Sequence, residues 1–104
     1  MRSHGWIDER SLALHAAVAD RLESEPKLIS IAHENLKRWL IANPAAALVE
    51  WQKLLDKLSL PEVLELLRSR SERAARLRQS SPFAGLLTSG ERQAILAQYE
   101  SRRT

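Results

Sequence analysis

Apolar side chains recur along the chain at intervals of three and four residues, the repeat of one face of an α-helix. Asp8 is placed to cap a helix expected over residues 8–24, whose apolar face is formed by Leu12, His15, Val18, Ala19 and Leu22. The same repeat predicts further helices over residues 26–42, residues 44–58, from residue 60 onwards, and over residues 89–101. Trp39 and Trp51 lie on the apolar stripes of consecutive helices and are expected to face each other in the core.

Prolines and capping residues separate these predicted helices. Pro26 and Pro44 cannot extend the preceding helix but fit the first turn of the next one, with Asn43 as the expected cap before Pro44. In a capping box, a Ser or Thr and a Glu three residues later bond reciprocally to the free N–H groups of a helix start. Two such boxes open the later helices, at Ser59–Glu62 and Thr88–Glu91.

The stretch of residues 60–79 is open to two interpretations. One helix continues to residue 79, or a separate helix begins at Ser71 and Glu72, since Ser is a weak helix former. Pro82 ends the helix in either case. Five or six helices joined by short connections predict one all-α domain over residues 1–104, a compact bundle in which residues 1–7 are flexible.

The composition agrees with helices and with an intracellular setting. Three glycines, an aromatic content of 5% and an abundance of Leu and Ala favour helices over sheet. The absence of Cys excludes disulfides and thiolate chemistry and fits a reducing compartment. No apolar run reaches the roughly 18–20 residues of a membrane span, and no secretory leader is recognisable. We therefore expect a cytoplasmic protein that does not bind membranes.

Charge is distributed unevenly along the chain. Residues 1–67 contain 8 Lys or Arg and 10 Asp or Glu, whereas residues 68–104 contain 8 Arg, no Lys and 3 Glu. Arginine presents a planar fork of donors that matches carboxylates and phosphates. The basic C-terminal part thus indicates an anionic partner, or, as the simpler alternative, a solvated helix face.

The candidate partner-binding residues lie in and directly after this basic stretch. Arginines would supply charge and a loop would supply an apolar anchor, the set being Arg73, Arg76, Arg78, Ser81, Phe83 and Leu86. The loop has two interpretations: its apolar side chains fill the end of the bundle, or Phe83 projects into a partner's pocket with Gly85 shaping the turn. Both interpretations hold if the Phe83 side chain points into the bundle and the Leu86 side chain points outward.

Other chemistry has little support in the sequence. The three histidines, His4, His15 and His33, lack metal-ligand spacing, so no metal or cofactor is expected. No nucleophile elbow or glycine-rich phosphate loop indicates an enzyme. Arg10-x4-His15 is similar to the Arg-x4-6-His signature of HEPN ribonucleases, but His15 lies on the apolar stripe and is expected to be a hydrogen-bonded core residue. The alternative function is a regulator that binds DNA or RNA through its arginines, although no aromatic platforms lie between them.

Three parts of the chain resemble a family of small bacterial proteins: the opening helix, Trp51 and a segment after residue 70. That segment reads Ser71-Glu72-Arg73-Ala74, then Leu77-Arg78-Gln79-Ser80-Ser81-Pro82-Phe83-Ala84-Gly85, and ends with Glu91-Arg92. The resemblance covers about residues 8–99. The family is that of MenA-type antitoxins, which are paired with nucleotidyltransferase-like toxins. It implies stoichiometric inhibition, in which arginines occupy the toxin's acidic active site. Ser89-Gly90 departs from the helix-favouring pair expected there.

Overall fold

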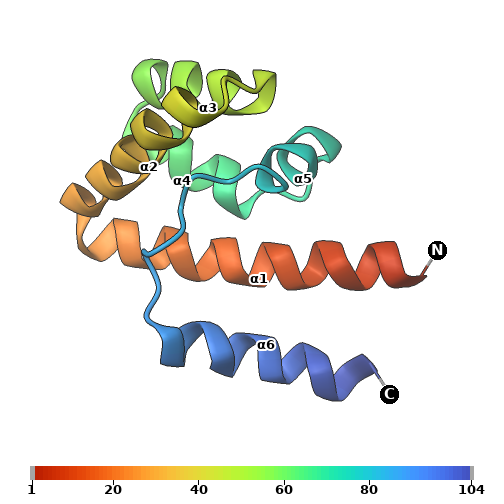
Figure 1. Cartoon of the computed structure of the whole chain (residues 1–104). Helices are drawn as coiled ribbons and strands as arrows, with labels where there is room; N and C mark the ends of the chain where they lie inside the picture. The colour runs from red at the N-terminus through yellow and green to blue at the C-terminus, as the bar shows by residue number, and fades with distance from the viewer. Residues whose placement is uncertain (1, 104) are drawn as a thin grey trace.

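The 23-residue helix α1 (Arg2–Ser24) is the helix against which α4, α5 and α6 pack. In the computed structural model, which describes residues 2–103 and the side chains of residues 8–99, α4 and α5 lie along one side of α1, and α6 runs antiparallel to it along another (Figure 1). Helices α2 and α3 pack on each other (Figure 1). Within residues 2–103 the chain forms six α-helices and no strand, which confirms the all-α bundle.

The remaining elements follow in short succession. A 3₁₀ turn, η1 (Pro26–Leu28), leads into the later helices, which are α2 (Ile29–Ala42), α3 (Ala46–Lys57), α4 (Leu60–Arg68), α5 (Glu72–Arg78) and α6 (Ser89–Arg103). None of the helices in the described part of the chain contains a stretch that is both long and apolar enough to cross a bilayer.

Two predicted helix starts are wrong. Helix α1 begins at Arg2, so Asp8 lies inside it and is not its cap. The stretch before Asp8 has no apolar repeat, and hydrophobic periodicity therefore does not detect its helical backbone. The side chains of residues 1–7 lie outside the described residues, and their flexibility stays a prediction.

The second wrong start is that of α3. Asn43 is extended, as the residue before a proline prefers, and its N–H bonds to the Trp39 carbonyl 2.8 Å away. Asn43 thus ends α2 instead of opening α3. The Asn43 carbonyl accepts the Ala45 N–H at 2.8 Å, and Ala45 becomes the residue before the helix.

The predicted caps of the later helices are confirmed. The Ser59 N–H donates to Glu62 Oε1 at 2.8 Å, and the Thr88 N–H donates to Glu91 Oε1 at 2.8 Å, with the reciprocal bonds also present. Between residues 60 and 79, the interpretation with a separate helix is the correct one. The Ser71 hydroxyl accepts the Ala74 N–H at 3.1 Å and so caps α5 as a new helix.

Trp51 occupies the centre of the core and has no exposed surface. Its Nε1 donates to the Leu77 carbonyl at 2.8 Å, and its ring meets that of Phe83 edge to face, with the centroids 5.5 Å apart. Trp39 is only half-buried, so its prediction as a second core tryptophan facing Trp51 is wrong. Around Trp51 pack buried side chains from every helix between α1 and α5, among them Leu22, Leu36, Leu55, Leu67 and Leu77.

Candidate functional site

Two of the predicted arginines share one exposed face of α5. Arg73 and Arg76 are one helical turn apart, and both are exposed. Arg76 binds Glu50 of α3 through two parallel bonds, from Nη1 to Oε1 and from Nη2 to Oε2, each 3.0 Å long. The Arg76 hydrogen bond is the main cause that lowers the Glu50 pKa, and the charge of Arg73 adds to it. Two guanidinium groups therefore lie near the Glu50 carboxylate.

Two further arginines connect the α4–α5 turn to α1. Arg68 Nη2 lies 2.7 Å from Asp20 Oδ1 and 2.9 Å from Glu23 Oε1. Arg70 Nη1 lies 2.6 Å from Glu9 Oε1. The basic end of the chain thus binds the acidic face of its first helix. All of these groups are largely exposed, so each pair contributes little to stability, and part of the charge asymmetry in the sequence is compensated within the molecule.

Arg78 is buried and so is not part of the exposed arginine surface, and its role as a partner contact stays a prediction. Its side chain follows Leu77 and Ala74 onto the buried face of α5, and only 6% of the residue is exposed. Arg78 Nη1 donates to the Ser69 carbonyl at 2.6 Å, which fixes the turn between α4 and α5. Burial lowers the Arg78 pKa, and its Nε is a buried donor with no bonded acceptor among the residues that the structure describes.

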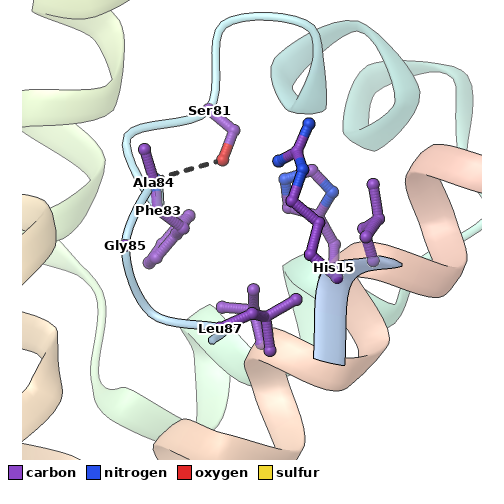
Figure 2. Close-up of a pocket in the computed structure, with 9 residues that line it drawn as sticks. His15, Ser81, Phe83, Ala84, Gly85 and Leu87 are labelled. Carbon is purple, nitrogen blue, oxygen red and sulfur yellow. Dashed lines mark hydrogen bonds between the residues drawn. The ribbon is translucent and has the colours of Figure 1, made fainter. Parts of the chain in front are cut away.

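The loop over residues 79–88 belongs to the core. Phe83 and Leu86 are 4% and 3% exposed, so the loop fills the end of the bundle and the outward orientation considered for Leu86 is wrong. Ser81 is half-buried, and its Oγ accepts the Phe83 N–H at 3.3 Å (Figure 2). Gly85 adopts a φ of 93°, a left-handed conformation that favours glycine, and it thereby turns the chain between the two buried side chains.

Sequence reasoning missed the residue that holds this loop in place. Asn35 of α2 is buried, and its Nδ2 donates to the carbonyls of Pro82 and Ala84, each at 2.9 Å. Asn35 Oδ1 accepts a bond from Arg38 Nη2 at 2.8 Å. The signal was present in the sequence, because Asn35 lies on the stripe formed by the apolar residues of α2. A polar residue on such a stripe needs buried partners.

A groove beside His15, which we call the His15 groove, lies where α1, α5, α6 and the loop meet. It consists of two adjoining cavities that share Leu14, His15 and Arg92. The apolar cavity has a volume of about 190 Å³ and lies between His15 and the loop (Figure 2), with walls that include Val18, Phe83 and Leu87. The polar cavity, of about 420 Å³, is lined in addition by Asp8, Arg10, Ser11, Ala75, Arg78 and Gln79.

His15 is a neutral hydrogen-bond acceptor in this groove. Its Nδ1 donates to the Ser11 carbonyl at 2.8 Å, which is the bonded core histidine that the sequence predicts. Burial is the main cause that lowers the His15 pKa, the Ser11 bond opposes this, and the charge of Arg78 reinforces it. A neutral imidazole that donates through Nδ1 carries a lone pair on Nε2.

The described residues include no group of three or more side chains placed to hold a metal ion. Comparison of the chain with protein-family models, with curated proteins and with solved structures finds no match in any of the three.

Proposed function

We propose that the protein is a binding module that neutralises another protein by inserting arginine side chains into its acidic active site. The carrying observation is the surface formed by Arg73 and Arg76, where two exposed guanidinium groups lie near the carboxylate of Glu50. An antitoxin for a nucleotidyltransferase-like toxin is the specific form of this function that the sequence resemblance implies. Catalytic carboxylates of such a toxin are the groups that paired guanidinium forks recognise best.

The bond between Arg76 and Glu50 suits this role because it can be exchanged. Both side chains are well exposed, at 56% and 34%, and an exposed pair contributes little to folding. A partner's carboxylate in a desolvated pocket offers Arg76 a stronger interaction than Glu50 does in water. Arg73 is a second exposed cation one helical turn away. Arg76 must exchange its bonds to Glu50 for a partner's carboxylate, whereas Arg73 has no such bond to a carboxylate among the described residues.

Carboxylates interspersed among the arginines favour a protein over a nucleic acid as the partner. Glu62 and Glu65 line the same surface groove as Arg68 and Arg73. A continuous phosphate backbone would be repelled at these positions, since affinity for nucleic acid depends on neutralising successive phosphates. A protein surface carries charges of both signs and can match this mixture.

The decisive experiment removes both arginines of the α5 surface. Isothermal titration of Arg73→Ala/Arg76→Ala against a nucleotidyltransferase-like toxin of the resembled family is expected to give at least about a tenfold higher Kd, in the range of interface hot spots. The double variant should retain the helical circular dichroism and Tm of the wild type. Lys37→Ala, which removes an exposed cation of α2, is the matched control and should bind normally.

Unchanged affinity and unchanged toxin neutralisation by the double variant would contradict the proposal. The same titrations with duplex DNA and with RNA test the alternative. If binding depends on phosphate contacts, the logarithm of the association constant should fall against the logarithm of the salt concentration with a slope of about 0.9 per phosphate contacted. Sequence-specific binding tighter than about 100 nM at physiological salt would assign the function to nucleic acid instead.

A further inference from the structure

We propose that the His15 groove binds a small phosphate monoester that carries an apolar or aromatic group. The two cavities divide the ligand between them, with the phosphate in the polar cavity and the apolar group against the loop. This site is separate from the Arg73–Arg76 surface, because it uses Arg78 and Arg92, which that surface does not include.

The polar cavity has the charge that a phosphate dianion requires. The charged side chains that line it among residues 8–99 are three arginines, Arg10, Arg78 and Arg92, and one carboxylate, Asp8. His15 is neutral there, so these described side chains together carry a net charge of two positive units. A phosphate monoester carries about −1.5 to −2 at pH 7, whereas a carboxylate carries one negative charge. Ser11 and Gln79 add uncharged donors in the same cavity.

Arg78 gives independent evidence that this cavity is incomplete without an anion. The side chain is 94% removed from solvent, its one bond to protein is that to the neutral Ser69 carbonyl, and its Nε has no acceptor among the described residues. Burying a cation in this way is unfavourable unless an opposite charge lies nearby. Asp8 supplies part of that charge from the cavity wall. A bound phosphate would supply the remainder across the same cavity.

The apolar cavity is the reason that we expect an ester and not inorganic phosphate as the ligand. Its walls are mainly hydrophobic and come from α1 and from the loop, including Leu14, Val18, Phe83 and Leu87. Gly85 leaves the loop backbone without a side chain at this wall (Figure 2). Ligand sites combine such apolar walls with a few convergent polar groups. Arg92 and the His15 ring border both cavities, where the ester oxygen would lie.

The test compares three probes that fill different parts of the groove: phenyl phosphate, inorganic phosphate and benzoate. Titration followed by ¹H–¹⁵N spectra should show phenyl phosphate shifting the His15 ring signals and binding at least about tenfold more tightly than either other probe. Arg92→Gln should weaken phenyl phosphate at least about tenfold, and Arg92 is exposed, so the variant should fold. Arg73→Gln, an exposed arginine outside the groove, should bind phenyl phosphate as the wild type does.

Three outcomes would overturn this proposal. They are no binding of phenyl phosphate at millimolar concentration, equal affinity for phenyl phosphate and inorganic phosphate, and an affinity that Arg92→Gln leaves unchanged. Because Arg73→Gln separates the groove from the α5 surface, failure here leaves the proposed protein-binding function standing, and failure of that function leaves this site standing.

Discussion

Trp51 is the side chain on which the core depends most. It is fully buried, its indole N–H is bonded to the Leu77 carbonyl, and its ring packs on Phe83. One residue of α3 therefore holds α5 and the loop against the same centre. Removing the ring would leave a large cavity and remove one of the hydrogen bonds that the Leu77 carbonyl accepts, another coming from the Ser80 N–H at 3.1 Å.

We expect Trp51→Ala to lower the free energy of unfolding by about 3–5 kcal/mol, the range for deleting a buried aromatic side chain. Urea denaturation followed by circular dichroism measures this change. Trp51→Phe should lose less, about 1–3 kcal/mol, because it keeps an apolar ring and gives up the hydrogen bond. Trp39→Ala is the matched control, and a loss as large as that of Trp51→Ala would contradict the burial described here.

Single residues also show where sequence reasoning succeeds. Trp51 was predictable because its position in the apolar repeat of α3 settles which way it faces. The burial of Arg78 was not foreseen, because its charge was given more weight than its position. Ala74, Leu77 and Arg78 are three and four residues apart and so share one face of α5, and all three are buried. The long Arg stem can lie on the core while its Nη1 reaches the Ser69 carbonyl.

At the scale of elements, the loop of residues 79–88 depends on its backbone conformation as much as on its side chains. Gly85 has a φ of 93°, and a Cβ placed there would meet Ile31 Cγ2 at 3.8 Å, an ordinary contact. Space is therefore available for a side chain. The obstacle to substitution is the left-handed conformation itself.

Gly85→Ala is expected to destabilise the protein by about 1–2 kcal/mol, the penalty for an L-residue in left-handed backbone. Gly90→Ala is the control, since Gly90 lies in the first turn of α6, where a Cβ would meet only Thr88 Oγ1 at 4.0 Å. Alanine there should leave stability unchanged or raise it by up to about 1 kcal/mol. Thermal unfolding of both variants measures these changes in stability. A Gly85→Ala variant as stable as the wild type would show that the left-handed backbone at this position imposes no penalty on a side chain.

The existence of the helices was predictable from the sequence except for that of α5 as a separate helix, which stayed one of two interpretations. Two of the helix starts and the contacts of the loop were not predictable. Capping boxes located the starts of α4 and α6 because their bonds are local. The Asn35 bonds to the loop join residues 47 and 49 positions apart, and no local pattern specifies such a pairing. The His15 groove arises in the same way, from four segments that meet only in the folded chain.

For the whole molecule, stability should depend on pH in two separate ranges. His15 has a pKa below its usual 6.5 in the folded state, so the unfolded chain binds more protons between that pKa and 6.5. Its contribution is complete above pH 6.5 and is lost as the pH falls towards the folded pKa. Glu50, Glu62 and Glu91 have pKa values lowered from 4.5 by their bonds to Arg76, Ser59 and Thr88, and their contributions are lost below pH 4.5.

Urea midpoints measured between pH 8 and pH 3 should therefore fall first below pH 6.5 and again below pH 4.5. His15→Gln keeps a donor but does not titrate, so it should remove the first fall and preserve the second. If His15→Gln shows the same loss between pH 7 and pH 5 as the wild type, another group is responsible for the first range.

The bonds from Asn35 to the loop have a consequence for the order in which the chain folds during its synthesis. A ribosome releases α1 to α4 before the residues that complete their core, because Phe83 and Leu86 are translated after them. Until then the Asn35 amide lacks its acceptors and the Trp51 ring lacks its aromatic neighbour. Native packing is therefore completed only when the loop leaves the exit tunnel, and α1 to α4 cannot reach it before then.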